Sequence, residues 1–220
     1  MDMLRLLAAA LLVILPTGAQ TLPDKAICPV CAVLEAPKTP EPEKVKAGSE
    51  YAGKPYYFCS PDCKIKFDED PPGFIPPVFP YPAPSASVLG LDGREITLKT
   101  YRGKAVLLDF WATWCKPCEK LMPDLQKLHD QYAAKGLAVL GISIDEGKDA
   151  AGKVQKFVGK KKIAYPVFLD LAEEPAWAAF HVKAIPVLFL IDPQGQVVGR
   201  WQGGFDYREV ETEVIRLLEH

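Results

Sequence analysis

The fold is decided by the stretch Ala105-Val106-Leu107-Leu108-Asp109-Phe110, followed after four residues by Cys115-Lys116-Pro117-Cys118. The first part is a continuous apolar run, typical of a strand buried in a parallel sheet. The second part places two thiols, two residues apart, where that strand turns into a helix. A thiolate at a helix N-terminus faces unpaired N–H groups and the positive end of the helix dipole, so its pKa falls and it becomes nucleophilic. The stretch therefore predicts a dithiol that performs thiol–disulfide exchange.

Each residue around the dithiol has an expected role. Cys115, taken as the first helical residue, is the nucleophile, and Cys118, one turn later, is the shielded resolving thiol. Lys116 adds a positive charge and Pro117 fixes φ at the helix start, so both tune the redox centre. Asp109 lies on the buried strand, where desolvation raises the pKa of a carboxyl towards neutrality, which suits a proton acceptor. The cysteine pair could instead be a structural bridge or half a zinc site, and Asp109 an ordinary, partly exposed strand residue.

Strands and helices alternate from residue 85 onwards. Asp92-Gly93 is typical of a hairpin turn between two short strands. Further strands are expected over residues 137–144, 167–169, 187–191 and 197–201, and further helices over 149–158, 173–180 and 208–219. Alternating units of this length predict an α/β domain, with a parallel-rich sheet covered by helices.

The stretch 110–118, together with Pro123 and Ala184-Ile185-Pro186, resembles the thioredoxin superfamily. The resemblance implies a thioredoxin fold over residues 85–220, a mixed central sheet flanked by helices. It implies that Pro186 is the family's cis-proline, that Ile185 and Pro186 bind substrate, and that Trp114 is an aromatic platform beside the thiols. Asp109 matches the buried aspartate of thioredoxins.

Segments 92–98, 141–145 and 189–195 are similar to the exported TlpA/ResA-type branch, which serves cytochrome maturation and copper-site assembly. This likeness implies thiol-bearing or disulfide-bearing periplasmic proteins as partners and an upstream membrane electron donor. The dithiol chemistry needs no cofactor. Many members of the branch carry a glutamate three residues after the second cysteine, where this chain has Leu121. Any acid/base role of that glutamate would therefore fall to Asp109.

Four further cysteines, Cys28, Cys31, Cys59 and Cys63, form two close pairs. Two such pairs separated by a loop can present four thiolates to a soft metal, such as zinc or copper. Residues 51–64 resemble the YHS/TRASH-type metal-binding domains, which implies a small cysteine-rich α+β domain over residues 20–70. Two structural disulfides, or a second dithiol that exchanges with the first, are the alternatives.

The N-terminus predicts export. Arg5 precedes an apolar run over residues 6–15, and the small residues Thr17-Gly18-Ala19 suit cleavage, so residues 1–19 are expected to be a signal peptide. An uncleaved anchor is the alternative, although ten apolar residues fall short of the ~20 that span a bilayer. We therefore expect a periplasmic protein with no stable membrane span after cleavage.

Composition and charge narrow the class of function. The formal net charge is −2 and no basic block occurs, which argues against a nucleic-acid partner. Residues 71–84 are rich in proline and predict an extended linker between two domains. The sequence as a whole predicts an exported thiol–disulfide oxidoreductase that reduces disulfides of periplasmic proteins. The competing hypothesis is a metal-delivery or metal-sensing protein whose thioredoxin-like part serves mainly for binding.

Overall fold

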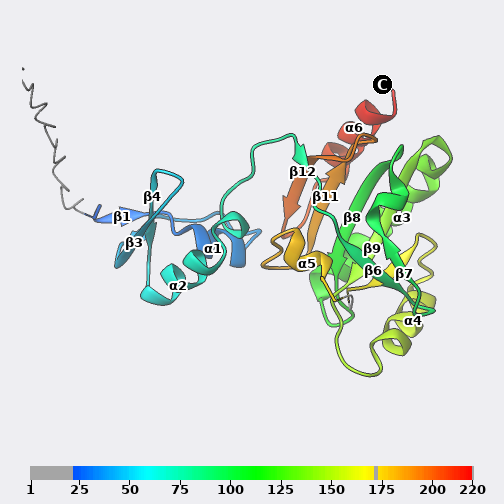
Figure 1. Ribbon diagram of the computed structural model, residues 1–220, viewed down its shortest axis with the longest axis horizontal. Helices are drawn as coiled ribbons and strands as arrows, with labels where there is room; N and C mark the ends of the chain where they lie inside the picture. Colours follow the sequence, from blue (N-terminus) through cyan, green and yellow to red (C-terminus); the bar gives the residue numbers. More distant parts are fainter. Residues whose placement is uncertain (1–21, 171–172, 220) are drawn as a thin grey trace, which may run out of the picture.

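The computed structural model describes residues 22–170 and 173–219. It shows a small cysteine-rich part followed by a larger part built on a sheet (Figure 1). The expected signal peptide, residues 1–19, lies outside the described residues. In the portion of the chain that is described, no helix is long and apolar enough to cross a membrane.

The small part is an α+β unit around an aromatic core. Its elements are β1 (Lys25–Ala26), α1 (Pro29–Leu34), β2 (Glu43–Lys44), β3 (Ala47–Tyr51), β4 (Lys54–Phe58) and α2 (Pro61–Glu69). β3 and β4 form an antiparallel hairpin, and α2 packs on it. Phe67 of α2 is fully buried, with ring centroids 5.0 Å from Phe58 and 4.8 Å from Tyr56. The core is small, so cross-linking of the nearby cysteines would add much of the stability.

The larger part is built on a mixed sheet whose described strands follow the order β5-β12-β11-β8-β9-β10-β6-β7. β8, β9 and β10 are parallel, and β11 is antiparallel to β8. The strands are β5 (Tyr81–Pro82), β6 (Ser87–Gly90), β7 (Glu95–Thr97), β8 (Ala105–Trp111), β9 (Leu137–Ser143), β10 (Val167–Leu169), β11 (Val187–Ile191) and β12 (Gln196–Gln202). The helices are α3 (Lys116–Tyr132), α4 (Ala150–Lys161), α5 (Ala176–Ala179) and α6 (Tyr207–Leu218).

Helices cover both faces of this sheet. Leu125 and Leu128 of α3 and Val210 and Val214 of α6 share one apolar cluster with the central strands. α5 and the adjoining Phe180 pack in a separate cluster with side chains of the opposite face. A mixed sheet flanked by helices, preceded by a small cysteine-rich unit, confirms the predicted fold class.

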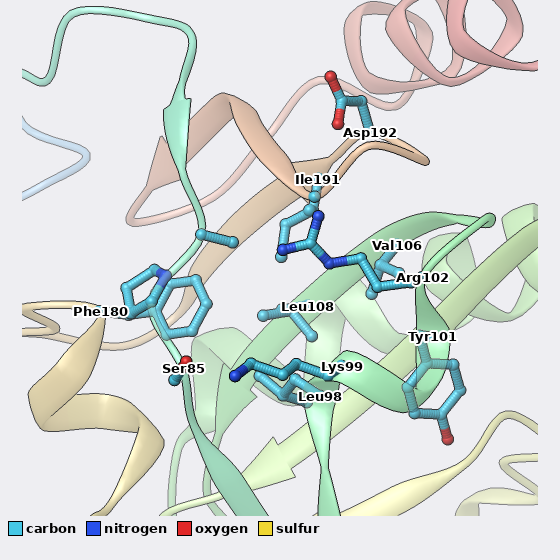
Figure 2. Close-up of a pocket in the computed structure, with 13 residues that line it drawn as sticks. Ser85, Leu98, Lys99, Tyr101, Arg102, Val106, Leu108, Phe180, Ile191 and Asp192 are labelled. Atoms are coloured by element: carbon cyan, nitrogen blue, oxygen red, sulfur yellow. The ribbon is translucent and has the colours of Figure 1, made fainter.

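Strand β8 is buried along its whole length, and this burial explains the nearly continuous run of apolar residues in its sequence. Successive side chains of a strand point to opposite faces. Leu107 and Trp111 pack in the two clusters that contain α3 side chains, so Asp109 between them faces α3 as well. A cavity of about 60 Å³, lined in part by Leu108 and Phe180, lies on the other face and has no cysteine in its wall (Figure 2). It is therefore not part of the redox site.

The proline-rich segment 71–84 differs from a free extended spacer. Phe74 is buried in the core of the small part, and Tyr81–Pro82 form β5, which pairs with the edge of the sheet at β12. Burial of the aromatic rings favours packing over extension, and proline is tolerated in an edge strand. The helix expected over 173–180 is the shorter α5, and the Asp170 carboxylate accepts hydrogen bonds from the N–H groups of Ala176 and Trp177 at its start.

Candidate functional site

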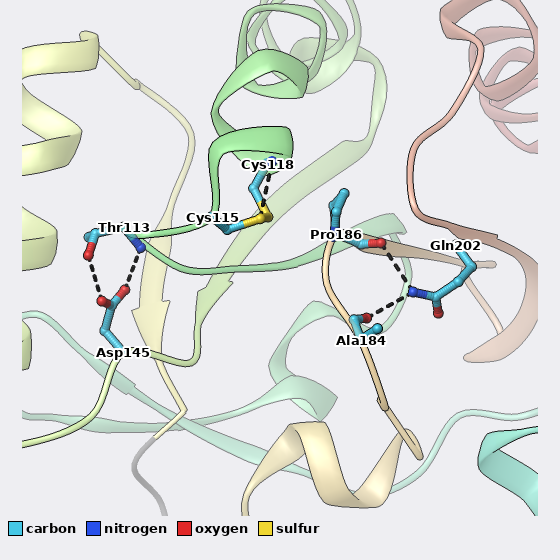
Figure 3. The surroundings of a disulfide bond; sticks show 7 residues. All are labelled: Thr113, Cys115, Cys118, Asp145, Ala184, Pro186 and Gln202. Atoms are coloured by element: carbon cyan, nitrogen blue, oxygen red, sulfur yellow. Dashed lines mark hydrogen bonds between the residues drawn. A yellow bond between two sulfur atoms is a disulfide. The ribbon is translucent and has the colours of Figure 1, made fainter. Parts of the chain in front are cut away.

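The dithiol lies where β8 passes into α3. Cys115, expected to be the first helical residue, is instead the N-cap of α3, which begins at Lys116, and it forms a disulfide with Cys118 (Figure 3). Its Sγ accepts a hydrogen bond from the Cys118 N–H at 3.2 Å. Cys115 is 5 % exposed and Cys118 1 % exposed. Both cysteines are thus buried, and the Cys115 sulfur faces the start of the helix, where backbone N–H groups stabilise a thiolate.

A buried carboxylate holds the turn before the dithiol in place. Asp145, 5 % exposed, accepts hydrogen bonds from the Thr113 N–H at 2.7 Å and from the Thr113 hydroxyl at 2.6 Å (Figure 3). A third hydrogen bond comes from the Ser143 hydroxyl at the end of β9. Since two adjacent parallel strands end here, this carboxylate ties the end of β9 to the loop that leads to Cys115. Sequence reasoning quoted Asp145 only as part of a family motif and missed this role.

Asp109 lies beneath α3 and not at the surface beside the disulfide. It is 1 % exposed, so the alternative of a partly exposed strand residue is wrong. Its neighbours in register are Gly141 on β9 and Leu188 on β11, and neither offers a polar side chain. Burial raises the pKa of Asp109 to about 7. A carboxyl with this pKa can both accept and release a proton near neutral pH.

The loop before β11 lies next to the disulfide. The peptide bond between Ile185 and Pro186 is cis, and Ile185 packs against the apolar cluster that contains both cysteines. The Gln202 side-chain amide donates to the Ala184 carbonyl at 2.9 Å and to the Pro186 carbonyl at 3.4 Å (Figure 3). The Gly203 N–H also donates to the Pro186 carbonyl, at 2.8 Å. These bonds fix the loop to the end of β12. Nothing in the local sequence marks Gln202, because its partners are backbone groups 16 and 18 residues away.

Two residues next to the dithiol are open to solvent. Trp114 is 65 % exposed, which leaves its indole ring available for contact with a partner. The Lys116 ammonium lies 3.3 Å from the Glu119 carboxylate, which also pairs with Lys161. Hydrogen bonds from the Lys161 and Lys116 ammonium groups lower the pKa of Glu119. The charge of Lys116 is thus partly balanced by Glu119, which weakens the tuning expected from Lys116 alone.

The other four cysteines converge in the small part. Cys28 and Cys31 come from the start of α1, Cys59 follows β4, and Cys63 lies in α2. Their four sulfur atoms lie within 4.8 Å of one another. The Sγ–Sγ distances from Cys31 to Cys59, Cys59 to Cys63 and Cys31 to Cys63 are 3.5, 3.7 and 3.9 Å. Four sulfurs about 2.3 Å from a tetrahedral metal ion are about 3.8 Å apart, so the thiol group fits such an ion.

The thiols of this group are free in the structure. Burial raises the pKa of Cys59 to about 12, and burial also raises the pKa of Cys31. Four neighbouring thiolates need a cation to offset their charge. The donor set is therefore one that could bind a soft metal.

The small part contacts the loop that carries Pro186. The Asp70 carboxylate, at the end of α2, lies 2.6 Å from the Lys183 ammonium and 2.8 Å from the His181 imidazole. Lys183 also lies over the ring of Phe74, with its ammonium 5.7 Å from the ring centroid. Sequence reasoning did not single out these residues, because Asp70 and Lys183 are far apart in the chain.

Known proteins share these features. The model of the AhpC/TSA family matches residues 81–200, more than half of the chain. The chain belongs to the AhpC/TSA family. The model of a second family, the YHS domain, matches residues 38–78. These two matches confirm the predicted thioredoxin-like and YHS resemblances. The YHS match covers Cys59 and Cys63 but begins after Cys28 and Cys31.

The chain is similar to proteins named as a thiol-disulfide oxidoreductase, a thioredoxin-like protein and a thiol:disulfide interchange protein. The thiol-disulfide oxidoreductase ResA of Bacillus thuringiensis subsp. konkukian is 39 % identical over 135 residues, which cover 61 % of this chain and 76 % of that protein. The thioredoxin-like protein YneN of Bacillus subtilis is 32 % identical over 132 residues, 60 % of this chain and 76 % of that one. A crystal structure of a putative thiol:disulfide interchange protein DsbE from Chlorobium tepidum superposes with a TM-score of 0.57 at 29 % identity, covering 63 % of this chain and 96 % of that chain. The chain is a thioredoxin-like thiol–disulfide oxidoreductase.

Proposed function

We propose that this oxidoreductase is exported to the periplasm and reduces disulfide bonds of partner proteins there. The observation that carries the proposal is the Cys115–Cys118 disulfide at the start of α3, next to the loop with cis-Pro186. The partners we infer are proteins that need reduced cysteines, as in cytochrome maturation or copper-site assembly. A membrane protein upstream would return electrons to the dithiol. Support for export comes from the N-terminal sequence alone.

In the proposed reaction the Cys115 thiolate attacks one sulfur of the partner disulfide. A mixed disulfide forms, and the other partner sulfur leaves as a thiolate and takes a proton. Cys118 then gives its proton to the Asp109 carboxylate and attacks the Cys115 sulfur. The mixed disulfide breaks, the Cys115–Cys118 bond forms, and the second partner thiolate leaves. Two electrons pass from the dithiol to the partner.

The partner would be held by groups around the disulfide. Trp114 offers an exposed ring, and Ile185 and Pro186 border the thiols. An extended segment of the partner could pair with free backbone groups of this loop, as in strand addition. Pro117, in the first turn of α3, and Lys116 would affect the potential through the stability of the Cys115 thiolate.

For the small part we propose that Cys28, Cys31, Cys59 and Cys63 together hold one soft metal ion, zinc or copper. An ion bound by all four sulfurs would cross-link the small domain and leave no open coordination position. Through Asp70, this domain would support the loop that binds the partner. We propose that the cysteine-rich domain spans residues 20–70, the connecting segment residues 71–84 and the thioredoxin-like domain residues 85–220.

Two variants of the full chain test the redox proposal. Cys118→Ser should trap a mixed disulfide with an oxidised protein substrate, visible as a mass increase that a thiol reductant reverses. Cys115→Ser should trap nothing and reduce nothing. Reductase activity that survives in Cys115→Ser would refute the mechanism.

The second candidate function, metal delivery or sensing, is favoured by the four convergent thiols. The double variant Cys59→Ser/Cys63→Ser separates the two functions, because it removes half of the ligands and leaves the dithiol in place. If metal binding is lost and the rate of disulfide reduction stays within about twofold, disulfide reduction does not depend on the metal site. A transfer of metal to an acceptor that depends on Cys59 and Cys63 would favour delivery.

A further inference from the structure

Four buried polar atoms without a hydrogen-bond partner lie in the described residues on the side of the sheet that α3 covers. They are Asp109 Oδ2, Trp111 Nε1, Tyr165 Oη and His129 Nδ1. Buried polar atoms are nearly always paired, with protein or with internal water, because an unpaired one is costly. The Asp109 carboxyl and three further unpaired polar atoms on one side of the sheet therefore point to a shared role.

Gly141 shows that three of these residues meet. It lies opposite Asp109 in register, and a Cβ atom placed on it would be 3.1 Å from Trp111 Nε1 and 3.2 Å from Tyr165 Cε2. The edges of both rings thus converge over the glycine, next to the carboxyl of the adjacent strand. A side chain at this position would press against both rings, so the close approach of Trp111 and Tyr165 requires glycine here.

Tyr165 links the carboxyl to a histidine that reaches the surface. The ring centroids of Tyr165 and His129 lie 6.3 Å apart in an edge-on arrangement. Tyr165 is 3 % exposed, whereas His129 is half-buried, with Nδ1 on the buried side. Burial, and after it the negative charge of Asp109, raise the pKa of Tyr165 well above its usual value. The phenol therefore keeps its proton and can accept one hydrogen bond while donating another.

We propose that Tyr165 and His129 carry the proton between Asp109 and solvent, through internal water held between these side chains. Internal waters typically bind about three otherwise unpaired polar groups, and Asp109, Trp111 and Tyr165 supply such a set. Tyr165, from the segment before β10, lies close enough to Asp109 for the charge of the carboxylate to act on the phenol, and Cys118 comes from α3, which covers this side of the sheet. β9 and β11 contribute only Gly141 and Leu188.

This inference rests on the proposed role of Asp109, whose carboxylate takes up the proton of Cys118 during the reaction. When Cys118 attacks, Asp109 gains the proton of the Cys118 thiol. Before the next turnover Asp109 loses that proton to a water, the Tyr165 hydroxyl passes a proton on through its hydrogen bonds, and the His129 imidazole releases one to bulk water. Trp111 has no acceptor atom and only positions the water. Neither Tyr165 nor His129 touches the reacting sulfurs, so both are positioning residues.

The test uses the full-length mature protein with a peptide disulfide as the substrate. Rapid quench follows the first resolving step, and steady-state turnover with a chemical reductant of the dithiol follows the release of the Asp109 proton, both in H₂O and in D₂O. We expect Tyr165→Phe to slow turnover about tenfold and to raise its solvent isotope effect, with an unchanged first resolving step and an unchanged reduction potential. Tyr101→Phe is the matched control: this phenol is half-buried on the opposite face of the sheet (Figure 2) and should change nothing.

A second variant guards against a folding defect in Tyr165→Phe. His129→Ala should also slow turnover, and free imidazole in the buffer should restore the turnover rate, which a purely structural loss would not allow. If Tyr165→Phe folds and keeps the wild-type rate and isotope effect while Asp109→Asn is slow, the relay is wrong and the role of Asp109 stands. If Asp109→Asn is itself as fast as wild type, the proposed proton acceptor is wrong. A slow His129→Ala that imidazole does not rescue overturns the part assigned to His129.

Discussion

Replacement of Asp109 by asparagine should stabilise the oxidised protein near neutral pH. Burial raises the pKa of this carboxyl from 3.8 to about 7. Between these two values the folded protein keeps a proton that the unfolded chain has released. The favourable contribution of protonated Asp109 is thus complete below the unfolded pKa, declines as the pH rises, and is lost above the folded pKa. Three pH units at about 1.4 kcal/mol each put the cost of the buried carboxylate at about 4 kcal/mol.

The assay is urea unfolding of the oxidised full-length protein between about pH 5 and about pH 8. The disulfide removes the titration of Cys115 and Cys118, so the carboxyl dominates the difference between variant and wild type. Asparagine keeps the shape of the side chain without its charge. We expect the free energy of unfolding of Asp109→Asn, relative to wild type, to rise by about 3 kcal/mol across this range. Asp130→Asn, on the exposed face of α3, is the control and should show no such trend.

The decisive quantity is the change with pH of the difference in unfolding free energy between Asp109→Asn and wild type. The absolute size of that difference also includes any repacking around the new side chain. A constant offset between acid and neutral pH would mean that the carboxyl is ionised in the folded protein throughout this range, and a rise that continues undiminished to about pH 8 would mean that it stays protonated. Either result would refute a pKa near 7 and, with it, the assignment of Asp109 as the proton acceptor. If Asp109→Asn is more stable than wild type and also loses the resolving step, the buried carboxylate lowers stability but is needed for proton transfer.

Three other changes test the supports of the site. Asp145→Ala should lower the free energy of unfolding by about 2–4 kcal/mol and slow disulfide reduction, since it leaves buried donors of Thr113 unpaired; unchanged urea unfolding would contradict this. Cys63→Ser should abolish bound metal in a native mass spectrum and lower the melting temperature of the small part, and retained metal would speak against a four-sulfur site. Asp70→Asn should increase hydrogen exchange in residues 181–186 and raise KM for a protein disulfide, with little effect on a small disulfide; equal effects on both substrates would argue against a docking role.

The sequence predicted what depends on local pattern. Strand β8 and the start of α3 follow from an apolar run and a cysteine–proline motif, and the burial of Asp109 follows from its place in that run. The expected positions of the other strands agree with the structure to within one residue at each end. Patterns of this kind are visible because the residues that create them are neighbours in the chain.

What the sequence did not predict depends on contacts between distant segments. Gln202 binds the carbonyls of the Pro186 loop, Asp70 binds Lys183, and Tyr165 approaches Asp109 from another strand connection. Each of these side chains is ordinary in its own surroundings. Only the register of the sheet and the packing of the small part bring them to the redox centre. The proline-rich segment is not the expected extended linker for the same reason, because its aromatic rings pack in the apolar clusters of both parts.

The cysteine pairs show why spacing alone does not decide chemistry. Cys28 and Cys115 are both N-caps of helices with proline in the first turn, and both have a second cysteine three residues on. The Cys115 sulfur accepts a hydrogen bond from the N–H of its disulfide partner, Cys118. Cys28 and Cys31 meet two more thiols from β4 and α2, which suits a shared cation, while Cys115 and Cys118 meet only each other beside a loop open to a partner. The same local motif thus favours a closed metal site in one place and a reversible bond in the other, because the fold supplies different neighbours.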